Sequence, residues 1–184
     1  MITIKDIIIE GIYNEILKEE MKSLTVDLSV FIYKDSIAIL DFNKTDFIIG
    51  GVNLKQDRLN PECHYPTIIY SERGYGHLLY KLAMQKYKWI CPTQGMDVSK
   101  LAKLSWKRLY NDNTIIKEPL DMPFYIQYGR KYEHKEKYLK CKYTTTNKID
   151  ISKNIDKCNE YVSEHKINEN DLYNEINNYI SSRI

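Results

Sequence analysis

The sequence contains no hydrophobic run long enough to cross a membrane. A spanning helix needs roughly 20 consecutive apolar residues, and no stretch of the 184-residue chain approaches that length. Lys5 and Asp6 would also interrupt the apolar core of a signal peptide at the start of the chain. We therefore expect a soluble, cytoplasmic protein that is not exported and has no membrane partner.

Neither sign of charge dominates, because the sequence contains 27 Lys and Arg residues and 25 Asp and Glu residues, which gives a formal net charge of +2. Proteins that neutralise a nucleic-acid backbone are usually much more basic, so nucleic acid is not an expected partner. The cysteines form no CxxC pair, which argues against a zinc site and predicts reduced thiols, with no metal bound. They are Cys63, Cys91, Cys141 and Cys158.

The common glycine-rich nucleotide motifs are missing too. The chain has no glycine-lysine-serine/threonine sequence of a P-loop, and its RGYG sequence is too short for a dinucleotide fingerprint. Residues 65–82, YPTIIYSERGYGHLLYKL, instead predict a strand, a glycine turn and a helix in direct succession. Gly74 and Gly76 permit close approach to the main chain, and the N–H groups of the following helix favour an anion. The plain alternative is a tight strand-to-helix connection without a ligand.

The remaining pattern predicts an α/β domain over residues 1–143, with an antiparallel meander followed by a strand-helix-strand-helix segment. The chain is too short for two independent cores. The second of these helices starts at Asp97 or Ser99, which can cap it. We expect helices at 6–20, from Gly74 through Ala83 and at 99–109, strands at 28–33, 36–41, 46–49, 65–70, 89–91, 124–128 and 138–143, and loops at 50–64 and 129–137.

Residues 144–184 differ in character and predict a linker and a polar helical tail. Leu172, Ile176 and Ile180 recur at helical spacing within residues 169–182. Such a narrow apolar stripe packs either on its own domain or on another chain, as a homo-oligomer or with a protein partner.

Two motifs carry a resemblance to a known family. The loop SERGYG ends the predicted strand and enters the helix, and Ser99, Ala102, Trp106 and Tyr110 follow at fixed offsets on the next helix. Both resemble the GNAT family of acyl-CoA-dependent N-acyltransferases, in particular the divergent GNAT-like proteins of tailed phages. In that family the loop is Gln/Arg-x-x-Gly-x-Gly/Ala, so Ser71 replaces the usual Gln or Arg. The later helix carries Asn, Ala, Tyr and an aromatic residue, so Trp106 replaces a Tyr.

The resemblance implies a GNAT-like mixed, mostly antiparallel, twisted sheet with splayed central strands and helices on both faces. Residues 68–70 and 89–91 are the expected diverging pair, and their main-chain groups would bind the amides of pantetheine. The pyrophosphate of acyl-CoA would lie on the helix that begins near Gly74. The expected cofactor-binding residues are Ile68, Ile69, Tyr70, Arg73, Gly74, Tyr75, Gly76 and His77.

The resemblance also implies transfer of an acetyl or other acyl group from acyl-CoA to a primary amine of a protein lysine or a small molecule. The tyrosine that serves many members as general acid corresponds to Trp106, whose indole cannot exchange a proton usefully. His64 is the candidate base and Tyr110 the candidate acid. Ser105 and Cys91 rank below Tyr110, and water is a further possible proton carrier.

Two other functions stay open at this point. A catalytically degenerate GNAT-like phage protein, acting in the host cytoplasm, would serve as a virion or host-interaction protein. Nucleic acid would bind through residues 130–142, where lysines alternate with Tyr138 near Tyr143. A solvated hairpin is the simpler interpretation of that basic segment.

Overall fold

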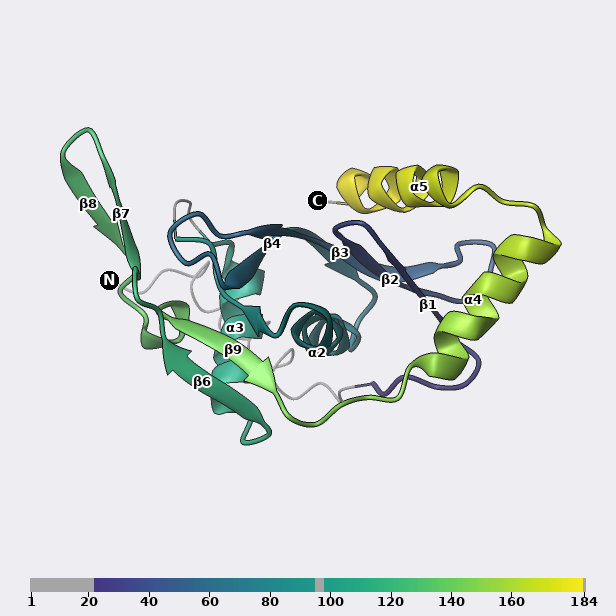
Figure 1. Ribbon diagram of the computed structural model, residues 1–184, viewed down its shortest axis with the longest axis horizontal. Coiled ribbons are helices and arrows are strands. Elements are labelled where there is room, and N and C mark those ends of the chain that lie inside the picture. Colours follow the sequence, from purple (N-terminus) through teal and green to yellow (C-terminus); the bar gives the residue numbers. More distant parts are fainter. Residues whose placement is uncertain (1–21, 95–97, 184) are drawn as a thin grey trace, which may run out of the picture.

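The computed structural model describes residues 22–94 and 98–183, which form a curled seven-stranded sheet with helices packed against it (Figure 1). The strand order is β1-β2-β3-β4-β5-β9-β6, and among these neighbours only β4 and β5 are parallel. The predicted mixed, mostly antiparallel sheet is therefore confirmed. The strands are β1 (Ser29–Tyr33), β2 (Ser36–Leu40), β3 (Ile48–Gln56), β4 (Cys63–Ser71), β5 (Trp89–Ile90), β6 (Ile115–Pro119) and β9 (Cys141–Thr145).

Four α-helices lie in the described part of the chain, and none of them is long and apolar enough to span a bilayer. Ser99, one of the two expected caps, accepts a hydrogen bond from the N–H of Ala102 at 3.2 Å. Asp97 and the helix expected at residues 6–20 lie outside the described residues. The helices are α2 (Gly76–Tyr87), α3 (Lys100–Asn111), α4 (Ser152–Glu164) and α5 (Glu169–Ser182), with a short 3-10 turn, η1 (Lys137–Leu139).

The loop expected at residues 50–64 is wrong, because β3 continues through this segment as far as Gln56. Gly50 and Gly51 lie inside the strand, where they allow close packing rather than a turn. A Cβ atom on Gly50 would lie 2.8 Å from the carbonyl oxygen of Tyr70, and one on Gly51 would lie 2.5 Å from Cδ1 of Ile180. Adjacent glycines usually indicate a loop, so the strand expected at residues 46–49 was predicted to end too early.

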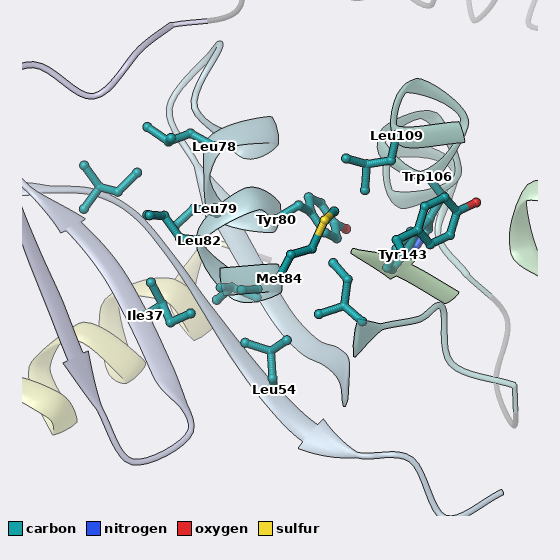
Figure 2. Packing of buried hydrophobic residues seen from close by; sticks show 14 of the residues in the cluster. Ile37, Leu54, Leu78, Leu79, Tyr80, Leu82, Met84, Trp106, Leu109 and Tyr143 are labelled. Carbon is teal, nitrogen blue, oxygen red and sulfur yellow. The ribbon is translucent and has the colours of Figure 1, made fainter. Parts of the chain in front are cut away.

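Helices cover both faces of the sheet at the β1–β3 end. Ile37 and Ile39 of β2 point into the core with α2, whereas Ala38 and Leu40 point to the opposite face with α5. This alternation follows from the two-residue repeat of a strand. Figure 2 shows the first of these cores, where Tyr80 and Met84 of α2 lie on the side of Trp106 and Tyr143.

The C-terminal helices pack on the sheet of their own chain. Leu172, Ile176 and Ile180 of α5 are buried against the face formed by Ala38 and Leu40. Figure 1 shows α5 lying along the sheet and α4 crossing beside β1. The first two residues of the predicted linker belong to β9, which ends at Thr145.

The C-terminal half contains two strands that the sequence did not predict. β6 pairs with β9 at the edge of the sheet, and β8 (Arg130–Glu133) pairs with β7 (Phe124–Gln127) in a separate hairpin. Tyr128 and Gly129 form its two-residue turn with φ of 50° and 72°. The four residues of β8 are all exposed, so they lack the apolar alternation that identifies a strand.

Candidate functional site

β4 and β5 are paired only where they begin. Cys63 lies opposite Trp89 and His64 lies opposite Ile90, and no further β5 partner follows within the described residues. β4 continues to Ser71, paired with β3 along its other edge. Main-chain N–H and C=O groups of a strand need hydrogen-bond partners, so this edge of β4 can bind the polar groups of an extended ligand.

A cavity of about 450 Å³, here called the strand cavity, lies between this part of β4 and α3. Its volume falls in the usual range of small-molecule sites. One wall is β4 and the opposite wall is α3, with Tyr80 of α2 between them. The lining residues are Lys55, Tyr65, Pro66, Thr67, Ile68, Ile69, Tyr80, Thr93, Val98, Ser99, Ala102 and Trp106.

A second cavity of about 380 Å³, here called the helix-end cavity, lies where α2 begins. No side chain caps α2 at Tyr75, and its first turn contains no acidic residue. Gly74 has φ of 89°, which favours glycine. Uncapped N–H groups with a partial positive charge attract an anion. The lining residues are Ser71, Glu72, Arg73, Gly74, Gly76, His77, Leu101, Leu104, Ser105 and Arg108.

The same helix supplies a wall of both cavities. Ala102 and Trp106 of α3 line the strand cavity, and Leu101 and Ser105 line the helix-end cavity. Burial raises the pKa of Tyr80, and a hydrogen bond with the Ser105 hydroxyl lowers it by a smaller amount. One ligand could therefore bind along α3, with its anionic end in the helix-end cavity and its extended chain in the strand cavity.

Two arginines and one carboxylate, Glu72, line the helix-end cavity. Arg108 lines it, and the Nη2 atom of that guanidinium is buried without a hydrogen-bond partner in the described structure. Nε2 of His77 lies 3.2 Å from Oδ2 of Asp112, outside hydrogen-bond geometry, and Nζ of Lys81 lies 3.3 Å from the same oxygen. A buried cationic nitrogen without a partner is costly, and an anionic ligand would satisfy it.

The predicted cofactor-binding residues divide between the two cavities. Ile68 and Ile69 line the strand cavity. Arg73, Gly74, Gly76 and His77 line the helix-end cavity.

Tyr70 and Tyr75 line neither cavity. The ring of Tyr70 meets that of Tyr179 on α5 with centroids 5.8 Å apart. Nζ of Lys22 lies 5.1 Å from the ring centroid of Tyr75, and the N–H of Lys22 donates to the Gly74 carbonyl at 3.2 Å.

The two predicted catalytic residues line neither cavity. His64 stacks on Tyr87 with ring centroids 4.1 Å apart, and its Nδ1 is buried without a partner in the described structure. Burial, followed by the charge of Lys86, lowers the pKa of His64. Tyr110 packs against the main core, with Nζ of Lys117 6.0 Å from its ring centroid.

Trp106 is the residue that the sequence resemblance aligns with the general acid of the GNAT family. It is only 2% exposed, and its ring contacts those of Tyr80 and Tyr143 at centroid distances of 4.9 and 5.2 Å. This side chain shapes the wall of the strand cavity and does not offer an exchangeable proton there.

Neither metal ligation nor thiol chemistry is supported at this site. The described residues contain no group of three or more His, Cys, Asp and Glu side chains that could hold a metal ion. Cys63 and Cys91 are fully buried. A hydrogen bond with Cys63 and burial both raise the pKa of Cys91, so its thiol is a poor nucleophile.

Sequence reasoning missed Arg108, Tyr80 and Asp112, because only the fold brings α2 and α3 together. Tyr80 sits within the GYGHLLY sequence, but its role as a wall of the cavity depends on packing against Trp106. Tyr143, which directly follows the basic segment considered for nucleic acid, is fully buried and so cannot stack on a base.

Comparison with known proteins gave no relative: no family model, no curated protein and no solved structure matched this chain.

Proposed function

We propose that this protein is an acyl-CoA-dependent N-acyltransferase of the GNAT type, close to the phage branch of that family. The observation that carries the proposal is the free edge of β4, which borders one cavity and leads to a second cavity at the uncapped start of α2. Acyl-CoA has the matching chemistry, since its pantetheine arm carries amides and its other end carries phosphates.

The main chain would do most of the binding. The amides of pantetheine would hydrogen-bond the β4 edge at residues 65–70, and the pyrophosphate would meet the first N–H groups of α2. The buried Nη2 of Arg108 would supply a charge-assisted hydrogen bond to a phosphate oxygen. This division explains why Ser71 is tolerated where the family has Gln or Arg, because Arg108 reaches the same cavity from α3.

The reaction would be direct transfer. The nitrogen of an amine attacks the thioester carbonyl, the C–N bond forms, the C–S bond breaks, and the electron pair leaves with the thiolate. A β4 N–H can stabilise the oxyanion in between. His64 and Tyr110 stay the predicted base and acid, and their protons would travel through water because neither side chain lines the cavities. The acceptor would be a protein lysine or a small amine.

The direct test is calorimetric titration with acetyl-CoA. We expect micromolar affinity for the wild type and binding at least tenfold weaker for Arg108→Gln, since a hydrogen bond to a charged group contributes about 1.5–3 kcal/mol. Lys107→Gln is the matched control, because this exposed neighbour on α3 lines neither cavity, and it should bind like the wild type. Absence of heat at millimolar acetyl-CoA would contradict the proposal.

A second function is a GNAT-like protein that acts through contacts with a virion or host protein and does not catalyse transfer. It is favoured by the buried Trp106 and by the position of both predicted catalytic side chains outside the cavities. Release of free CoA thiol from acetyl-CoA in the presence of a panel of amines would support the enzyme. No binding of acetyl-CoA at millimolar concentration would support the second function.

A further inference from the structure

His77 combines burial with a position in the wall of the helix-end cavity. Its side chain is 9% exposed, and its Nε2 has no hydrogen-bond partner in the described structure, although Oδ2 of Asp112 lies 3.2 Å away. The residue belongs to the first turn of α2, where the helix N-terminus disfavours a positive charge. This position therefore favours the neutral form of the imidazole.

The charged groups around His77 come from three parts of the chain. Lys81 lies one turn later on α2, Arg108 lies on α3 with Asp112 directly after it, and the turn before α2 contributes Arg73 and the carboxylate of Glu72, which is paired with Lys44 at 3.5 Å. Burial lowers the pKa of His77, Lys81 and Arg108 lower it further, and Asp112 opposes them without reversing the shift. Without a ligand, the ring is therefore neutral at neutral pH.

We propose that His77 takes up a proton when a phosphate-bearing ligand binds in the helix-end cavity, so that the site holds its ligand more tightly in mildly acid solution. This inference rests on the proposed function, because it takes the ligand to be acyl-CoA. Phosphate oxygens beside the ring favour its charged form. By linkage, a ligand that favours the protonated ring must bind more tightly when the ring is already protonated. The proton comes from the solvent and is released when the ligand leaves.

The probe should be dephospho-CoA rather than CoA. The terminal 3′-phosphate of CoA is a monoester and itself titrates near pH 6, which would mask the proton taken up by the protein. Dephospho-CoA retains the pyrophosphate, whose oxygens stay ionised throughout this range. Calorimetry at about pH 6 in two buffers of different ionisation enthalpy then counts the protons bound per ligand.

The wild type should take up a substantial fraction of one proton and bind dephospho-CoA about three- to tenfold more tightly at about pH 5.5 than at about pH 7.5. His77→Gln should abolish both effects. His165→Gln should retain them, because this exposed histidine at the end of α4 lies outside both cavities. In the wild type, the NMR titration of the His77 ring should move to higher pH when dephospho-CoA is added.

The outcomes separate the two proposals. Binding of dephospho-CoA without proton uptake, or uptake that persists in His77→Gln, overturns this inference and leaves the proposed function standing. No binding at any pH, with acetyl-CoA equally inert, overturns both. A ring titration that stays unchanged when the ligand binds overturns the inference even if the variant fails to fold.

Discussion

At the scale of single residues, Asp112 connects the two helices that border the helix-end cavity. Its carboxylate accepts hydrogen bonds from the N–H and hydroxyl of Thr114 at 2.8 and 2.6 Å and lies 3.3 Å from Nζ of Lys81 on α2. Burial alone would raise the pKa of Asp112, but these hydrogen bonds and Lys81 lower it to about 2. The fold therefore stabilises the ionised form.

Asp112→Asn should lower the free energy of unfolding at pH 7 by about 1 kcal/mol, the discounted value of a partly exposed charged contact. A carboxyl with a depressed pKa contributes stability above its unfolded value of 3.8, and this contribution is lost as the pH falls towards about 2. Urea unfolding of both proteins should therefore show a difference at pH 7 that shrinks across that window. A difference that is constant down to about pH 2 would refute this role.

At the scale of elements, two glycines of β3 allow this strand to lie close to β4 and to α5. Gly50 faces main-chain atoms of β4, whereas the nearest atom to a Cβ on Gly51 is the end of the Ile180 side chain on α5. A side-chain tip can change rotamer, but the backbone of a paired strand cannot move without breaking its hydrogen bonds.

Gly50→Ala should therefore destabilise the protein by about 1–3 kcal/mol, the usual cost of overpacking. Gly51→Ala is the matched control, and it should cost less because Ile180 can move away. Denaturant midpoints at constant slope measure both changes. Equal losses of stability in the two variants would show that the rigid contact between β3 and β4 does not determine the cost of the Gly50 substitution.

The same elements show what the sequence could predict. Short runs rich in β-forming residues predicted β1 and β2 correctly, and the strand-glycine-helix pattern predicted β4 and α2. The glycines of β3 led to the prediction of a loop, and the exposed charged residues of β8 also led to the prediction of a loop. Local sequence patterns reflect the conformational preferences of the backbone, whereas these two strands form because of contacts with neighbouring strands in the folded protein.

At the scale of the whole molecule, the candidate site arises from the curled sheet. The glycine turn was visible in the sequence, but the partnership of Arg108 with His77 required α3 to fold back beside α2. Charges separated by about thirty positions in the sequence cannot be assigned to one cavity from spacing alone. Among the residues that line the helix-end cavity, the sequence therefore pointed to Arg73, Gly74, Gly76 and His77 but not to Arg108.

The central claim is that one extended ligand lies along the free edge of β4 with its phosphates at the start of α2. Backbone amide NMR shifts of the chain during addition of CoA test this claim most directly. We expect the largest changes at residues 65–70 and 74–78, with little change in α4 and α5. Saturable changes confined to other surfaces, or no changes at millimolar CoA, would contradict it.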